Sequence, residues 1–287
     1  MSNTTQWFPL MIAVVMFGLG LTLTVDDFRR VAEVRRPVAI ALWCQIIVLP
    51  AICYGIAVLF QLPPDLAVGL MLMAASPGGA MANILSHLAD GDLALNLTLT
   101  AINAGLAIIT IPVILAVAMA GFMDEDRVIP LQYGKFFQVF GFIAIPVGLG
   151  MWVRGRLPEV AERMNRPVKV VVALVLAAVA YVSLVTGWDT LTAHFQILGG
   201  AVLTLCVTSL TVGYLVPRSM RLPRRRAIAI SLEIGLHNTV LAVAIAMSPS
   251  LLNNPSMAVP GALYGVLAVF VGLAFILVVN RVDTAGA

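Results

Sequence analysis

Charge is the scarcest property of this 287-residue sequence. Only 11% of its residues are charged and 61% are hydrophobic, whereas soluble domains carry about 25% charged residues. No long polar segment interrupts the apolar runs, so a second, soluble domain has no room to exist. These deficits exclude a soluble globular protein and indicate a polytopic membrane protein.

Motifs of enzymes and nucleotide-binding proteins are also missing. The sequence contains no P-loop, no G-x-G-x-x-G after a strand, no H-E-x-x-H and no nucleophile elbow. Ser86, His87 and Asp90 are neighbours in the sequence, but their positions suit a catalytic triad poorly, because a triad depends on geometry. The three cysteines lie in apolar segments without metal-ligand spacing and are interpreted as core residues. Four glycines are explained better by close helix packing than by a cofactor: Gly18, Gly20, Gly148 and Gly150.

Apolar runs long enough to cross a bilayer are abundant. A membrane-spanning helix needs about 20 predominantly apolar residues. We therefore expect an all-α integral membrane protein in which residues 1–287 form a single transmembrane domain. Nine transmembrane helices are predicted, at about 7–24, 37–60, 65–88, 93–119, 133–153, 168–187, 195–217, 226–248 and 257–280.

The basic residues alternate along these nine runs. Four follow the first run, five the fifth, five the seventh and one the ninth, whereas only Arg127 and Lys135 lie on the other side. Because loops rich in lysine and arginine stay in the cytoplasm, the pattern predicts an external N-terminus and a cytoplasmic C-terminus. The expected location is the cell (inner) membrane.

One carboxylate lies inside an apolar run. Glu233 belongs to the stretch EIGLHNTV (233–240), whereas the other acidic residues fall in loops or at the ends of runs. A charged residue at the bilayer centre costs at least about 2.5 kcal/mol on insertion scales. We therefore expect the helix to be interrupted here, with the carboxylate facing a cavity and a cation.

A second interruption is predicted in the third run. Pro77, Gly78 and Gly79 lie near its middle, where proline removes a backbone donor and glycines add flexibility. Interrupted helices at corresponding positions of two halves are typical of transporters built from inverted repeats. The simplest arrangement is two five-helix repeats, of which the first lacks its opening helix, so that the third run corresponds to the eighth.

Three stretches resemble the bile acid:sodium symporter family: MFGLGLTLTVDDFRRV (16–31), SPGGAMANILSHLADGDLALNLTLT (76–100) and EIGLHNTVLA (233–242). The resemblance implies a secondary active transporter that takes up a small organic anion by sodium symport through alternating access. Bile acid-like compounds, steroid sulphates, keto acids and pantoate-like acids all fit the family. It also implies a panel domain at about 7–24, 133–153 and 168–187, and a core domain at about 37–119 and 195–280, in which the two broken helices cross.

The same resemblance implies sodium ligands at matching positions. Ala82 and Asn96 stand where the family has serines, and His237 replaces a glutamine. Sodium is a hard cation that prefers oxygen, so a histidine nitrogen suits it poorly, and the resemblance leaves one or two bound sodium ions open. The implied ligands are Glu233, Asn83, Asn96, Thr100, Gln45, His237, Ile234 and Leu236.

The departure at His237 supports an alternative function. Histidine titrates near neutral pH, and His237 follows Glu233 by four residues, which places both on one helical face if the turn is intact. The alternative is a proton-coupled or uncoupled organic-anion transporter that uses this pair. A channel would need a continuous pore or rings of ligands, which a single buried carboxylate matches less well.

The substrate anion is expected at the N-termini of the half-helices, where backbone N–H groups favour negative charge. The expected partners are this small organic anion and the lipid bilayer, with no nucleic acid and no obligate protein partner. The candidate contacts are Asn238 and the backbone of Gly79, Ala80 and Met81.

Overall fold

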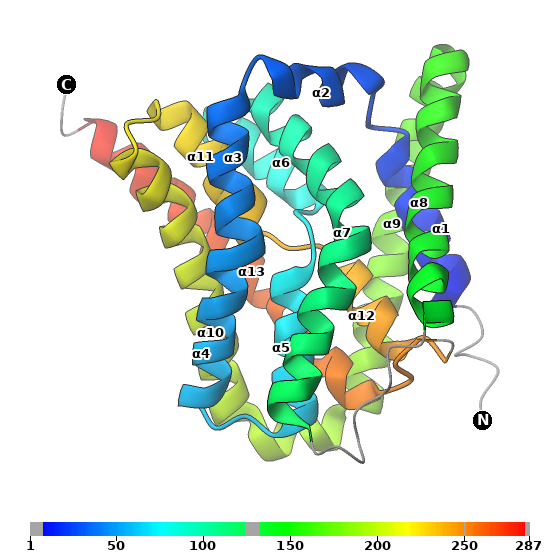
Figure 1. The fold of residues 1–287 in the computed structure, drawn as a ribbon, viewed down its shortest axis with the longest axis vertical. Coiled ribbons are helices and arrows are strands. Elements are labelled where there is room, and N and C mark those ends of the chain that lie inside the picture. Colours follow the sequence, from blue (N-terminus) through cyan, green and yellow to red (C-terminus); the bar gives the residue numbers. More distant parts are fainter. Residues whose placement is uncertain (1–7, 124–132, 250, 285–287) are drawn as a thin grey trace.

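The structure, a computed structural model, describes residues 8–123, 133–249 and 251–284. Arg127 and the first residue of the predicted 7–24 run lie outside these ranges. The described chain contains helices and no strand, so the all-α prediction is confirmed. In chain order (Figure 1) the elements are α1 (Phe8–Gly20), α2 (Val25–Arg29), η2 (Arg30–Ala32), α3 (Arg35–Trp43), η3 (Cys44–Val48), α4 (Leu49–Leu59), α5 (Pro64–Ala75), α6 (Ala80–Leu88), α7 (Leu93–Phe122), α8 (Tyr133–Arg156), α9 (Pro158–Thr186), α10 (Trp188–Ser219), α11 (Arg224–Gly235), α12 (Thr239–Met247) and α13 (Pro255–Thr284).

The helices agree with the predicted runs in position. Among the described residues, four stretches are long and apolar enough to cross a membrane by length and composition. The runs predicted at 65–88 and 226–248 each contain two shorter helices, as expected for interrupted helices. The number of nine transmembrane helices stays a prediction. The four long stretches are Arg35–Leu59, Leu93–Phe122, Trp188–Ser219 and Pro255–Arg281.

Helices extend beyond the apolar runs into segments that the sequence analysis treated as loops. Helix α9 already begins at Pro158, and α10 begins at Trp188. Proline is well placed at a first helical position, and an acidic residue lies in the first turn of each helix, Glu159 in α9 and Asp189 in α10. Such residues favour a helix N-terminus electrostatically, so helix formation does not stop where the hydrophobicity ends.

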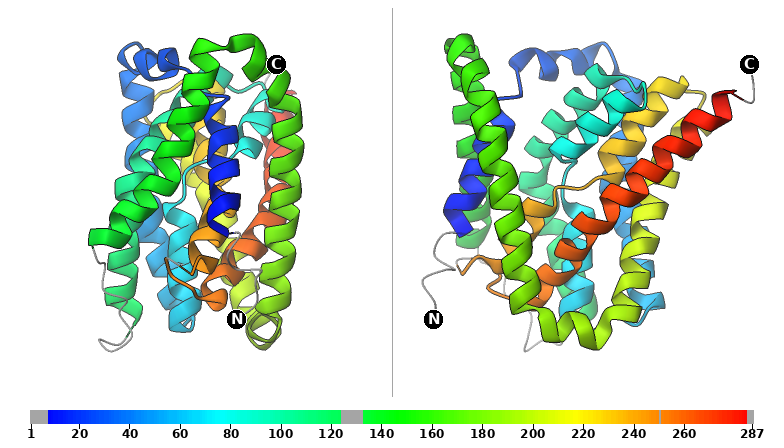
Figure 2. Two further views of the ribbon diagram at one scale, coloured as in Figure 1. Left: turned by 90° about the vertical axis from the view of Figure 1, so that its right-hand side faces the viewer. Right: turned by 180° about the vertical axis from the view of Figure 1, so that it is seen from behind.

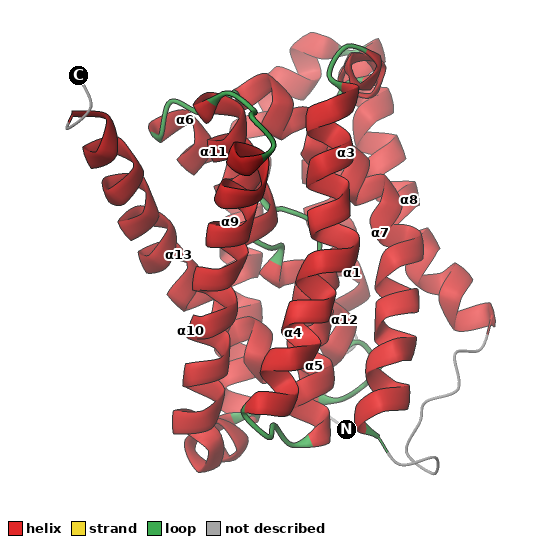
Figure 3. Cartoon of the chain, turned by 60° about the vertical axis from the view of Figure 1, so that its left-hand side comes forward, coloured by secondary structure: helices red, strands yellow, loops and turns green. Residues whose placement is uncertain are grey.

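The two interrupted helices meet inside the molecule. Residues 76–79 join α5 to α6, and residues 236–238 join α11 to α12 (Figure 3). The two segments run antiparallel and form an isolated bridge between Gly78 and His237. The Gly79 N–H donates to the Leu236 carbonyl at 2.9 Å, and the Asn238 N–H donates to the Pro77 carbonyl at 2.7 Å. Backbone groups released by each break are thus paired with the other break, as an apolar surrounding requires.

The helices that lead into the two crossings begin in the same way. The turns before α5 and α11 hold Gln61 and Arg221 in the left-handed region, with φ of 50° and 59°. One residue later, the Leu62 N–H donates to Ala57 and the Leu222 N–H donates to Pro217, both across five residues, which is the Schellman ending of a helix. The two local structures are therefore equivalent, 160 residues apart.

Three helices pack together at one side of the molecule. Helices α1, α8 and α9 contact one another there, while α3, α4, α10 and α11 lie at the opposite side, and α13 crosses from one side to the other and contacts both α9 and α10 (Figure 1). Figure 2 shows that the chain around residues 30, 155, 222 and 280 lies at one and the same end of the molecule. These are the segments that carry most of the basic residues, so the structure collects at one end the charges that the sequence distributes over four loops.

Candidate cation site at the helix crossing

Glu233 lies at the centre of the crossing and is fully buried. It is located in the last turn of α11. The Thr100 hydroxyl donates to Oε2 at 2.7 Å, and the Asn103 amide donates to Oε1 at 3.3 Å. A Cβ atom added to Gly78 would overlap the carboxylate, so the backbone of the first interruption lies directly against it. Both hydrogen-bond donors are neutral, and a buried carboxylate with neutral partners favours a cation.

The polar side chains around Glu233 come from one face of α7. Asn96, Thr100 and Asn103 are spaced by four and three residues, which places them on the same side of a helix. The Asn96 amide donates to the Ala229 carbonyl at 2.8 Å. The Thr100 hydroxyl lies 3.1 Å from the Asn96 carbonyl as well as 2.7 Å from Glu233, but it has only one hydrogen to donate. All three side chains of this face donate a hydrogen bond to α11, and Asn96 Oδ1 is left without a partner among the described residues.

Three amide oxygens near the crossing lack a hydrogen-bond partner among the described residues. They are Gln45 Oε1, Asn83 Oδ1 and Asn96 Oδ1, and all three atoms are buried. Leaving a buried acceptor unpaired costs about 1–3 kcal/mol. Neutral amide oxygens together with one carboxylate are the donor types that a hard cation prefers. The residues present therefore fit a sodium ion as transported substrate.

A local distortion of the helix positions Gln45. Residues Cys44–Val48 form a π-helical turn between α3 and α4. Pro50 follows within α4, and because proline has no N–H to donate, the regular hydrogen-bond pattern is disturbed in front of it. The Gln45 amide donates to the carbonyls of Ala74 and Ser76 at 3.2 and 3.1 Å. Its oxygen is thereby held at the end of α5, next to the first break.

His237 does not share a helical face with Glu233. Helix α11 ends at Gly235, and His237 lies in the extended crossing segment, so the condition on which the two residues would share a face, an intact helical turn, is not met. His237 Nδ1 lies 3.1 Å from the Ser76 carbonyl, which only accepts hydrogen bonds, so Nδ1 carries the proton. The ring packs against Tyr264 with centroids 5.3 Å apart. His237 Nε2 is buried without a partner in the described chain.

The remaining predicted ligands belong to the same break. The Leu236 carbonyl accepts from the Gly79 N–H. Ile234 is buried in the final turn of α11, where carbonyls run out of intrahelical donors. Ile234 and Leu236 are therefore at the crossing, while their coordination of sodium stays a prediction.

The predicted substrate contacts lie at the N-termini of the second half-helices. Asn238 is the N-cap of α12, and its Oδ1 accepts from the Leu241 N–H at 3.1 Å. Gly79 is the N-cap of α6, and α6 starts at Ala80. Met81, in the first turn, is 41% exposed. The backbone N–H groups of both helix starts can bind an anion. The crossing therefore contains groups that attract an anion as well as Glu233, which attracts a cation.

Three residues at the site were not predicted. Asn103 donates to Glu233, the Ser76 carbonyl accepts from both Gln45 and His237, and the Tyr264 hydroxyl donates to the Gly235 carbonyl at 2.8 Å. Asn103 was detectable as a polar residue three positions after Thr100 on the same face of an apolar helix. The roles of the other two depend on how distant segments meet, and no pattern in the sequence records that.

Comparisons with known proteins identify the family of this chain. A family model described as the sodium bile acid symporter family matches residues 9–194. The chain is 26% identical over 269 residues to the uncharacterized sodium-dependent transporter YocS of Bacillus subtilis, covering 91% of this chain and 79% of that protein. It is 27% identical to the probable sodium/metabolite cotransporter BASS1, chloroplastic, of Arabidopsis thaliana, covering 92% and 64%. It is 25% identical to the human ileal sodium/bile acid cotransporter, covering 85% and 70%. These relatives are transporters or cotransporters, which confirms the expectation that the chain is not an enzyme.

Proposed function

Since this chain belongs to the sodium bile acid symporter family, we propose that it takes up a small organic anion by sodium symport across the cell (inner) membrane. The observation that carries the proposal is the fully buried Glu233 at a crossing whose helices also carry buried amide oxygens without a partner among the described residues. A cation would neutralise the carboxylate and satisfy those oxygens at the same time. The anion would be a bile acid-like compound, a steroid sulphate, a keto acid or a pantoate-like acid.

The proposed sodium site is built on Glu233. Thr100, Asn83 and Asn96 supply the oxygens nearest in type to those of the family, while Gln45 and the carbonyls of the second break serve a second ion. His237 occupies a ligand position there with a nitrogen. One sodium ion is therefore better supported than two. The full set proposed is Glu233, Asn83, Asn96, Thr100, Gln45, His237, Ile234 and Leu236.

The proposed transport mechanism is alternating access between two rigid parts. The panel would consist of α1, α8 and α9, and the core would contain both interrupted helices. Nine transmembrane helices in two inverted repeats would produce this arrangement, and the equivalent turns before α5 and α11 support it. The crossing would stay near the midplane while the panel and core move against each other. The anion would bind at Asn238 and at the backbone of Gly79, Ala80 and Met81.

A thermal stability titration tests the sodium site without a known substrate. The purified protein is titrated with sodium chloride against potassium chloride at constant ionic strength. A ligand at one hundred times its Kd stabilises by about 2.7 kcal/mol, so the melting temperature should rise with sodium only. Glu233→Gln should remove the rise while the variant remains folded. A rise of equal size in Glu233→Gln would disprove the role of this carboxylate.

His237 Nε2, which has no partner among the described residues, favours a second candidate function. A nitrogen that lacks a partner can take up a proton, so the transporter would be proton-coupled or uncoupled, with Glu233 and His237 in place of a sodium ion. The same titration at two pH values separates the candidates. A stability shift that follows pH, ignores sodium and disappears in Glu233→Gln supports this candidate, and sodium sensitivity gained in His237→Gln supports it further.

A further inference from the structure

The polar face of α7 continues from the site to the end of the helix. Asp92, Asn96, Thr100 and Asn103 are spaced by four, four and three residues and therefore lie on one helical face. Successive turns of α11 oppose them: Arg226 Nε lies 3.6 Å from Asp92 Oδ2, and Asn96 and Thr100 bond to Ala229 and Glu233. A seam of polar groups thus connects Glu233 with the surface.

A buried hydroxyl of α6 lies near the helix ends that carry the seam. Ser86 is fully buried, and its Oγ has no partner among the described residues. A Cβ atom placed on Gly91 would lie 2.5 Å from this Oγ and 3.2 Å from Ile228 Cγ2. The hydroxyl is therefore located where α6, the loop before α7 and α11 meet. Because an unpaired buried hydroxyl is costly, we expect Ser86 to have a partner in another state of the protein.

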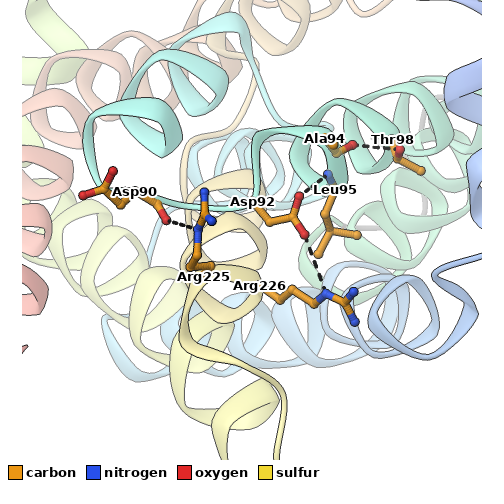
Figure 4. Close-up of polar contacts among 7 residues, drawn as sticks. All are labelled: Asp90, Asp92, Ala94, Leu95, Thr98, Arg225 and Arg226. Carbon is orange, nitrogen blue, oxygen red and sulfur yellow. Dashed lines mark hydrogen bonds and ion pairs between the residues drawn. The ribbon is translucent and has the colours of Figure 1, made fainter.

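An ion pair lies at the outer end of the seam (Figure 4). Asp92 and Arg226 are only 30% and 38% exposed. Asp92 Oδ1 also accepts from the Leu95 N–H at 3.1 Å and so caps α7. The neighbouring Arg225 is directed elsewhere, with Nε 3.0 Å from the Asp90 carbonyl. Arg226 is therefore the cation that presently neutralises the carboxylate at this end.

We propose that this seam is a cation path between Glu233 and the surface that bears Arg226, along which Asn96 Oδ1 and Ser86 Oγ, two buried oxygens without a partner among the described residues, serve as transient ligands. The Asp92–Arg226 ion pair closes the path, and a sodium ion opens it by competing with Arg226 for Asp92. The inference rests on the proposed function, because it assumes that Glu233 holds the ion. All the groups along the path offer oxygen, the donor that sodium prefers.

The opposite end of the molecule is built differently. There the loop before α13 meets the start of α5, and the Asn254 amide donates to Asp65 Oδ1 at 3.0 Å. An amide thus takes the position that an arginine has beside Asp92. A competing cation would displace no charge from Asp65, so an ion-operated closure is specific to the end with Arg226.

Cysteine accessibility tests the path with a cationic probe. In a background in which the three native cysteines are alanine, Ser86→Cys is exposed to a small ammonium methanethiosulfonate in detergent solution. We expect Ser86→Cys to react, sodium chloride to slow the reaction relative to potassium chloride, and Arg226→Gln to accelerate it about tenfold or more, as removal of a repelling charge does. Thr98→Cys is the matched control, because Thr98 is fully buried and bonds to Ala94 of its own helix (Figure 4). If Ser86→Cys is as unreactive as Thr98→Cys, or if Arg226→Gln has no effect, there is no such path.

Sodium binding kinetics provide a second measurement. Asp92→Asn keeps the helix cap, since asparagine caps as well as aspartate, but removes the charge. We expect the rate of the sodium-induced change in native tryptophan fluorescence to fall about tenfold while the equilibrium midpoint stays within twofold. An unchanged rate overturns the path. If sodium does not specifically stabilise the wild-type protein, the proposed function itself fails. If sodium stabilises the wild type but Ser86→Cys does not react, only the proposed path is refuted.

Discussion

At the scale of single residues, the decisive feature is the carboxylate of Glu233, which has no charged partner in the part of the chain that the structure describes. The Thr100 hydroxyl donates a hydrogen bond to it at 2.7 Å. Hydrogen bonds to charged groups contribute about 1.5–3 kcal/mol, which corresponds to a tenfold or larger change in an equilibrium constant. A hydroxyl that both orients the carboxylate and offers an oxygen should therefore affect sodium binding strongly.

We expect Thr100→Val to raise the sodium concentration at half-maximal stabilisation about tenfold or more. Valine keeps the shape of threonine but removes the oxygen. Thr98→Val is the control, because Thr98 is equally buried on α7 and bonds only to the Ala94 carbonyl, at 2.9 Å. Thermal shift titrations of the two variants make the comparison. Equal midpoints would mean that Thr100 does not contribute to the site.

The polar residues of the site could be predicted because they are expensive in a membrane. Glu233, Asn96 and Thr100 stand out from apolar runs, and the structure brings them together on α7 and α11. Asn103 has the same property and was missed. The role of the Ser76 carbonyl could not be predicted from the sequence. Every residue has a carbonyl, and only the tertiary structure decides which one accepts hydrogen bonds from two side chains.

At the scale of elements, Pro77, Gly78 and Gly79 predicted the first interruption and the charge of Glu233 predicted the second, but the hydrogen bonds between the two were not predicted. Pro77 and Gly78 indicated a break, and α5 indeed ends at Ala75. Whether the turn between Glu233 and His237 is intact was left open, because the local sequence does not reveal the residue, Gly235, at which α11 stops. The antiparallel bridge supplies the hydrogen bonds that a continued helix would have formed, and this compensation comes from a segment about 160 residues away.

The glycines between α1 and α8 give a prediction at this scale. A Cβ atom on Gly150 would overlap the Phe17 carbonyl and lie 2.8 Å from Gly20 Cα, whereas a Cβ atom on Gly148 would meet no atom of another part of the described chain within 4 Å. Close packing was expected of both, and for Gly148 this is wrong. Gly150→Ala should destabilise by about 1–3 kcal/mol through overpacking, while Gly148→Ala should be neutral or gain up to about 1 kcal/mol of helix propensity. Melting temperatures in one detergent decide this, and equal losses would contradict it.

At the scale of the whole molecule, charge placement was the most informative part of the sequence. The alternation of basic residues requires that alternate helix ends face the same way, and the basic segments do gather at one end (Figure 2). The packing of α1, α8 and α9 against the rest could not be derived from the residues alone. Apolar faces in a bilayer are nearly interchangeable, because lipid competes with every contact.

The orientation follows from this charge distribution and can be measured. Gln61 and Arg221 are exposed in equivalent turns, next to α5 and α11, and these turns lie at opposite ends of the molecule (Figure 1). With the basic end in the cytoplasm, Gln61→Cys should react with an impermeant thiol reagent in intact cells. Arg221→Cys should react only after the membrane is opened. The reverse pattern would invert the proposed orientation.

The contact between Gly78 and Glu233 also has a genetic meaning. A Cβ atom at residue 78 would occupy the space of the Glu233 carboxylate. Gly78→Ala should therefore displace this carboxylate and abolish its function, although the two residues lie in different halves of the chain. Glu233→Asp retracts the carboxylate by one methylene and should restore part of what the added methyl removes. In a selection for growth on the transported compound, second-site suppressors of Gly78→Ala are therefore expected at codon 233. A substitution at position 78 is then tolerated only together with a compensating substitution at position 233.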